Sequence, residues 1–307
     1  MSENGRKSMI KVRGGFSDKT GINPCNTQIQ LDEFDDRTRT TISNQLFRML
    51  EITFSNPLTF AKSPYDQKRQ LLSNEFCRAI SSDILSLPSR FDNSKVYNWQ
   101  FYFEKISNII DDAPYNEVLD VVWYCCHWLS TCTILDPKDI YDIFNETFGQ
   151  EYVGYRFISG EIVPITDENE VNEIEQACNT PFAGARTQLQ KALCFLSDRE
   201  NPDYKNCIKE SISAVESVCK VISGNEKAAL KDALNGLISN GMNIHGSLKT
   251  AILALYGYAS DEGGIRHAER ETESTVTFEE AKFMMVTCSA IVNYLVAEYG
   301  KHGAGNA

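Results

Sequence analysis

Residues 203–222 read DYKNCIKESISAVESVCKVI, and this stretch indicates the fold of the second half of the chain. Its apolar side chains recur every three or four positions, at Ile208, Ile212, Val215, Cys219 and Ile222. Because an α-helix brings residues with this spacing onto one face, the pattern predicts a long amphipathic helix that packs against others.

The same spacing predicts helices on both sides of this stretch. In the second half they cover 185–198, 228–238 and 248–258, and a last helix begins at the capping box Thr277-Phe-Glu-Glu280. Since residues 248–258 are apolar on most sides, we expect that helix to be deeply buried. In the first half, helices are predicted for 37–53, 64–87 and 99–110, after Pro114, and after Asp136-Pro137.

One short segment departs from the helical period. Tyr155 to Ile165 alternates around Ser159-Gly160, which is typical of a β-hairpin, and an acidic helix is predicted from Asp167 to Ala177. We therefore predict a mainly α protein with two helical domains, 1–150 and 181–302, joined by a hairpin and short helix at 151–180.

Composition excludes several classes of protein. The chain has 307 residues and a net charge of −12, with no broad basic region, so binding to duplex DNA is not expected. No run of 18 apolar residues and no apolar signal core occur, so we predict a cytoplasmic protein that does not enter a membrane.

The ten cysteines contain no C-x-x-C pair, and we expect them to be reduced and mostly buried. The run Cys125-Cys126-His127 suggests a metal site, but neighbouring residues on a helix diverge by about 100° and chelate poorly. No metal and no cofactor are predicted.

Candidate chemistry centres on the segment Ser260-Asp-Glu-Gly-Gly-Ile-Arg-His267. Arg266 could hold phosphate oxygens, His267 could transfer protons near neutral pH, and Asp261 could orient either of them. This set suits attack by an RNA 2′-hydroxyl on the adjacent phosphate. The alternative is an ion-paired turn that only joins two helices.

Two groups of segments resemble known families. Phe16–Gly21, Ile29-Gln30 and Arg37–Leu46 resemble the start of the N-terminal domain of AbiJ-like proteins of bacterial abortive infection. Tyr204–Glu216, Leu255–Tyr258, Gly264–His267 and Ala281–Cys288 resemble a HEPN-type helical domain.

The resemblance implies a role in antiviral defence. HEPN domains are helical bundles that commonly dimerise, and many are metal-independent ribonucleases whose motif places an Arg a few residues before a His. Here Arg266 and His267 are adjacent. Glu210 and Glu216 are second-tier candidates for the same cleft, with solvated carboxylates as the alternative. His245 is a further second-tier candidate, with a capping or packing role as the alternative.

Two main functions remain open from the sequence, beside a weaker third in which the protein recognises a nucleotide or structured RNA without cleaving it. The first is an anti-phage effector, a homodimer that cleaves cellular RNA without a metal and so acts as a toxin. The second is a non-catalytic HEPN-like module that dimerises or regulates a partner protein in a defence or toxin–antitoxin system.

Overall fold

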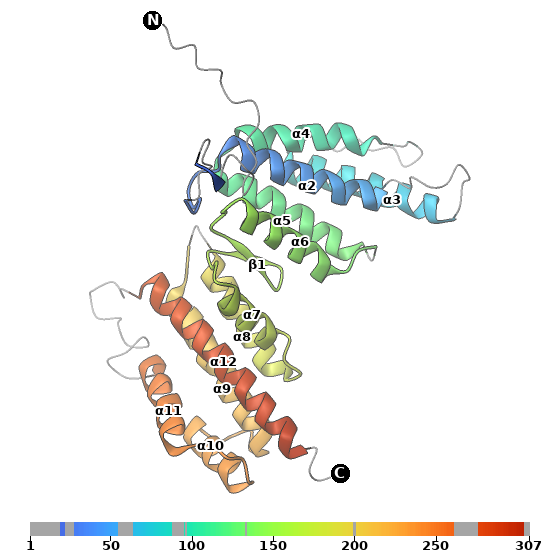
Figure 1. Cartoon of the computed structure of the whole chain (residues 1–307). Coiled ribbons are helices and arrows are strands. Elements are labelled where there is room, and N and C mark those ends of the chain that lie inside the picture. The colour runs from blue at the N-terminus through green and yellow to red at the C-terminus, as the bar shows by residue number, and fades with distance from the viewer. Residues whose placement is uncertain are drawn as a thin grey trace, which may run out of the picture. The chain divides into compact units, whose positions relative to one another are not determined.

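The computed structural model describes residues 19–21, 28–54, 64–87, 95, 97–132, 134–198, 201–260 and 276–303 (Figure 1). The chain divides into two compact units, Met1–Gly160 and Glu161–Ala307. This division falls within the segment 151–180 that was predicted to connect two domains. Each unit is considered by itself below.

The first unit is a set of packed helices followed by a strand. Its elements are α2 (Asp36–Phe54), α3 (Pro64–Ala79), the π-helical turn η1 (Ile80–Ile84), α4 (Trp99–Asp112), α5 (Tyr115–Thr131), α6 (Pro137–Gln150) and β1 (Arg156–Ile158). Helix α2 packs against α3, α4 and α6. The core includes a cluster of aromatic rings from Phe54, Phe76, Trp99 and Trp128, with neighbouring centroids 5.1–6.0 Å apart.

The segment 64–87 differs from the prediction that it forms one continuous helix. Helix α3 ends at Ala79, and the chain widens into a π-turn in which the Leu85 amide donates to the Ile80 carbonyl over 2.9 Å. Ser86 then takes a left-handed φ of 49°. The proline that follows Leu87 in the sequence disfavours a helical conformation at Leu87, so no helix could continue beyond this point.

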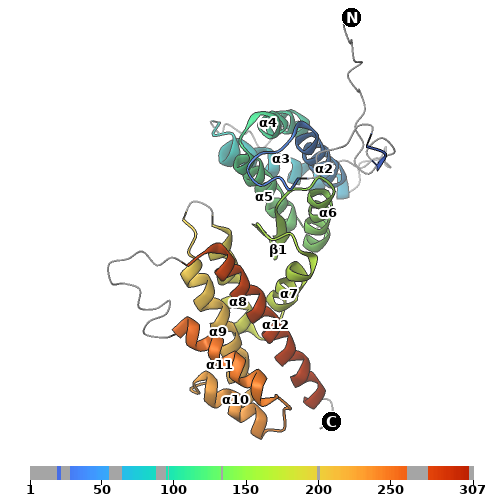
Figure 2. The ribbon, with the colours of Figure 1, turned by 60° about the vertical axis from the view of Figure 1, so that its left-hand side comes forward.

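The second unit is a helical bundle built around one central helix. Its elements are β2 (Glu161–Val163), α7 (Glu168–Cys178), α8 (Ala183–Ser197), α9 (Tyr204–Ser223), α10 (Leu230–Ser239), α11 (Gly246–Ser260) and α12 (Phe278–Gly303). Helix α9 contacts α8, α10, α11 and α12, and α12 runs along it (Figures 1 and 2). The stretch 203–222 is therefore the core helix that its apolar spacing predicts.

The hairpin is confirmed. Strands β1 and β2 pair, and their turn residues Ser159 and Gly160 both have positive φ, 49° and 92°. Tight two-residue hairpins favour this geometry because its twist matches that of the strands. Among the described ranges this is the one sheet, so the prediction of a mainly α fold is confirmed.

The prediction that residues 248–258 are deeply buried is wrong. In α11 only Ile252 and Ala259 are buried among residues 246–259, while Leu248 is 37% and Tyr258 39% exposed. The helix packs mainly against α9 and α10, which cover one side of it. An apolar composition therefore did not ensure that neighbours surround the helix.

Helix α12 is long and apolar enough, by length and composition, to cross a membrane. Core helices of globular proteins meet the same criterion, and a third of its most apolar window is buried within the protein. Lys282 pairs with Glu170 of α7 over 2.6 Å, and the Asn293 amide donates to Glu173 over 2.9 Å. The expectation that the protein does not enter a membrane remains a prediction.

Candidate functional site

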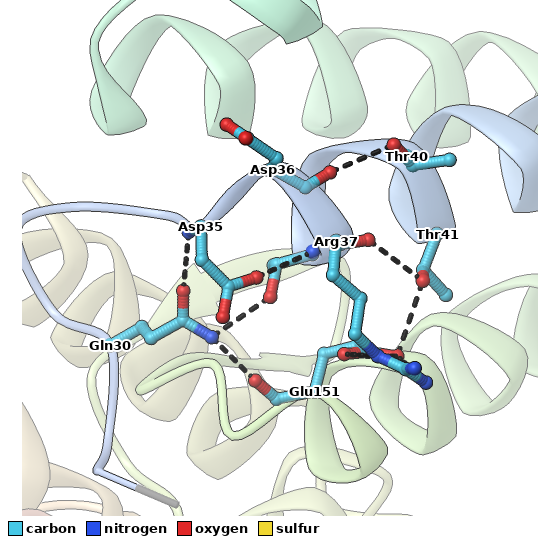
Figure 3. A network of polar contacts seen from close by, with 8 residues as sticks. Gln30, Asp35, Asp36, Arg37, Thr40, Thr41 and Glu151 are labelled. Atoms are coloured by element: carbon cyan, nitrogen blue, oxygen red, sulfur yellow. Dashed lines mark hydrogen bonds and ion pairs between the residues drawn. The ribbon is translucent and has the colours of Figure 1, made fainter. Parts of the chain in front are cut away.

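A network of polar contacts joins the start of α2 to the end of α6 (Figure 3). At its centre is Gln30, which is 7% exposed. Its side-chain amide donates to the Thr38 hydroxyl over 2.8 Å and to the Glu151 carbonyl over 2.6 Å, and its oxygen accepts from the Asp35 amide over 2.7 Å. Both the nitrogen and the oxygen of this buried amide therefore have hydrogen-bond partners, which fixes the orientation of the side chain.

An ion pair forms the second part of the network. The Arg37 guanidinium holds both oxygens of Glu151, with Nε 3.0 Å from Oε2 and Nη2 3.0 Å from Oε1. The Glu151 side chain is 2% exposed and that of Arg37 is 34% exposed. The Thr41 hydroxyl donates to the same carboxylate over 3.1 Å. A nearly buried carboxylate needs such partners, because burial alone would disfavour its charge.

Three further hydrogen bonds extend this network along α2. The Asp35 carboxylate accepts from the Thr38 amide over 2.8 Å and so caps the helix. Arg39 donates to the carbonyls of Ile110 and Ala113, each over 2.7 Å, at the end of α4. Gln30, Arg37 and Arg39 therefore stabilise the fold.

An open pocket of about 410 Å³ lies beside this network. It is lined by Gln28, Ile29, Gln30, Leu31, Asp32, Glu33 and Asp35. Ile29 is 57% and Leu31 45% exposed, so both side chains present apolar surface at the pocket. The pocket therefore combines exposed apolar side chains with carboxylates.

The predicted catalytic residues Asp261, Arg266 and His267 lie outside the described residues. The end of α11 and the start of α12, which flank these residues in the sequence, are described and lie close to each other. The Tyr258 hydroxyl of α11 donates to Glu280 of α12 over 3.2 Å.

The predicted capping box at the start of α12 is confirmed. The Thr277 amide donates to Glu280 over 2.9 Å, and the Glu280 amide donates to the Thr277 hydroxyl over 3.2 Å. The hydrogen bond from the Thr277 amide lowers the pKa of the Glu280 carboxyl, with smaller contributions from Tyr258 and the Thr277 hydroxyl. This carboxylate thus holds both the start of α12 and the end of α11.

The second-tier candidates do not converge on one point. Glu210 and Glu216 are half-buried on α9, six positions and hence about 120° apart around the helix. Glu216 pairs with Lys220 over 2.8 Å. His245 is exposed, and its Nδ1 accepts from the Ser247 amide over 3.2 Å at the start of α11, which is the capping role.

The Cys125-Cys126-His127 run does not form a chelate. Both thiols are fully buried, and burial raises the pKa of Cys125 to about 12, while His127 is exposed and stacks on Trp123 at 5.3 Å. Within the described ranges no group of three His, Cys, Asp or Glu side chains could hold a metal. Eight of the nine described cysteines are buried, and Cys25 lies outside the described residues.

The sequence did not predict one polar pair, Asp83 and Tyr124. Asp83 on the π-turn accepts hydrogen bonds from the hydroxyls of Ser82 and Tyr124, and these two contacts lower the pKa of the Asp83 carboxyl. Desolvation, followed by the bond to Asp83, raises the pKa of Tyr124. The periodicity predicted an ordinary helix here, so no sequence signal indicated that Asp83 would reach α5.

Comparison with known proteins identifies the first part of the chain. Residues 14–180 match the family described as AbiJ N-terminal domain 4. Neither the curated proteins nor the solved structures include a significant match to the chain. The match spans more than half of the sequence and includes the whole network around Gln30, Arg37 and Glu151. The chain therefore belongs to the AbiJ N-terminal domain 4 family.

Proposed function

We propose that this protein acts in abortive infection, the response in which a phage-infected bacterium arrests or dies before the phage spreads. Membership of the AbiJ family supports this role. The helical second unit then supplies the effector activity, because the family match ends at residue 180 and leaves most of that unit for a separate task.

The activity that we propose is metal-independent cleavage of cellular RNA. Its support is that Asp261, Arg266 and His267 belong to one segment whose flanking residues, Tyr258 and Glu280, are hydrogen-bonded. This contact holds the end of α11 beside the start of α12. Asp261, Arg266 and His267 also fall within seven positions of the sequence, which favours the joint action of a guanidinium and an imidazole.

The chemistry follows from these groups. An RNA 2′-hydroxyl forms a bond to its neighbouring phosphorus while the bond from phosphorus to the 5′-oxygen breaks, leaving a cyclic phosphate. His267 takes the proton of the 2′-hydroxyl, and water or a second acid protonates the leaving 5′-oxygen. Arg266 stabilises the charge that develops on the phosphate oxygens, and Asp261 orients His267.

Growth and RNA integrity test this proposal together. Induced expression of the wild-type chain should arrest growth, whereas Arg266→Ala and His267→Ala should restore it. Arg270→Ala, in the same segment, is the matched control and should remain toxic. Purified wild-type protein should cleave total tRNA in EDTA. Intact tRNA, together with undiminished toxicity of His267→Ala, would exclude the nuclease.

A second candidate function is supported by α11. Its outer side leaves Leu248 and Tyr258 exposed, and the resemblance to HEPN domains implies dimerisation. In this alternative the second unit forms a homodimer or docks onto a partner protein without catalysis. A stable dimer with intact RNA and non-toxic expression would favour the alternative.

A further inference from the structure

We propose that residues 6–13 of this chain bind, as an extended segment, in the pocket lined by residues 28–35. The pocket is therefore a docking site for the protein's own N-terminal segment. The inference does not depend on the nuclease proposal, because it concerns only the first unit.

The pocket has two features that a ligand must match. Ile29 and Leu31 expose 57% and 45% of their surfaces and lie on either side of Gln30, which forms a β-bridge with Val153. Residues 28–36 also carry four acids, Asp32, Glu33, Asp35 and Asp36, and no base. Asp32 and Glu33 are exposed at the pocket, whereas Asp35 is occupied by its capping bond. The expected occupant is extended, partly aliphatic and basic.

Residues 6–13 have this chemistry. They read RKSMIKVR and carry four bases and no acid. Ile10 and Val12 alternate with Lys11 and Arg13. Because successive side chains of an extended chain point to opposite sides, the two aliphatic residues can cover Ile29 and Leu31 while the two bases approach the carboxylates.

The chain also permits this docking. Residues 14–27 connect the segment to the pocket, and an extended chain spans about 3.3–3.6 Å per residue, so the segment can readily fold back. The entropic cost of closing such a loop grows only slowly with its length. The family match begins at residue 14, so residues 6–13 lie just before the matched domain that carries the pocket.

Hydrogen–deuterium exchange on the full chain tests the proposal. Amides in peptides covering residues 6–13 should exchange at least about tenfold more slowly than in an unstructured chain. The double substitution Asp32→Lys/Glu33→Lys should abolish this protection. Adding the compensating substitutions Lys11→Glu and Arg13→Glu to that variant should restore the protection. The matched control is Asp111→Lys/Asp112→Lys, two exposed acids at the end of α4, which should keep the protection.

Other results would overturn the proposal. Fast exchange of residues 6–13 in the wild type would show that the segment does not dock. If the wild type and the Asp32→Lys/Glu33→Lys variant protect residues 6–13 equally, the segment does not bind in this pocket. Protection that disappears on dilution would identify a second copy of the chain as the occupant. Circular dichroism of each variant checks that the fold is intact, and the four-site charge swap must recover protection.

Discussion

Gly154 shows how closely the segment before α2 approaches the turn after α6. A Cβ atom at this position would lie 2.4 Å from Leu31 Cδ2, 3.0 Å from Ile29 Cγ2 and 3.1 Å from the Gln30 carbonyl oxygen. The aliphatic side chains can move, but the backbone oxygen is held by its bond from the Gly154 amide. Only glycine leaves room for this parallel contact.

We therefore expect Gly154→Ala to lower the free energy of unfolding by about 1–3 kcal/mol. Urea denaturation measures this change. Gly149→Ala is the matched control, since its Cβ would meet only Arg156 at 3.5 Å, an ordinary contact. Equal stability of the two variants would mean that the segment 29–31 separates easily from Gly154.

The Arg37–Glu151 pair provides a second prediction at this scale. Arg37→Ala would leave a carboxylate that is 2% exposed without its bidentate cation, which should cost about 3 kcal/mol. Arg48→Ala, at an exposed position on the same helix, should change stability by less than about 0.5 kcal/mol. Calorimetric melting of both variants checks the difference. The prediction would be wrong if Arg37→Ala lowered the melting temperature no more than Arg48→Ala.

At the scale of elements, the capping box of α12 predicts a dependence on pH. The folded-state pKa of Glu280 lies below its unfolded value, so its stabilisation is present above the unfolded pKa of about 4.3 and is lost as pH falls through the folded value. The difference in Tm between wild type and Glu280→Gln should therefore be largest near neutral pH and vanish in strong acid. Thr277→Ala should cost about 1 kcal/mol at pH 7. A pH-independent difference would show that the charge of Glu280 is irrelevant.

The elements also show which sequence signals were informative. Helix α9 was predictable because its apolar residues recur every three or four positions, and those from Cys207 to Cys219 are buried against neighbouring helices. The π-turn at Ile80–Ile84 was not, since apolar spacing continues through it and only the backbone bonds widen. The burial of α11 was overestimated because an apolar composition does not specify how many helices pack around it.

At the scale of the whole molecule, the limits of sequence reasoning lie in contacts between distant residues. Arg37 and Glu151 are 114 positions apart, and neither belongs to a motif that would pair them. The two helical halves and the hairpin could be predicted because each depends on local periodicity and turn residues. The pocket at residues 28–35 could not, because an irregular segment has no periodicity from which its shape could be predicted.

The exposed side of α11 leads to a prediction about assembly. Leu248 and Tyr258 lie ten positions apart, about 80° around the helix from each other, and their exposed apolar surface would be covered in a homodimer. A new carboxylate in such an interface would be desolvated without a partner, so Leu248→Glu should weaken self-association at least about tenfold. Sedimentation velocity over a range of concentrations measures the change.

The matched control for this experiment is Val221→Glu at the end of α9, where an aliphatic residue is 56% exposed on the same unit. It introduces the same charge on a different helix of the same unit and should leave self-association unchanged. If both variants weaken association equally, net charge rather than α11 determines assembly. If the wild-type chain remains monomeric at every concentration, the exposed side of α11 does not bind a second copy, and a partner protein becomes the occupant to seek.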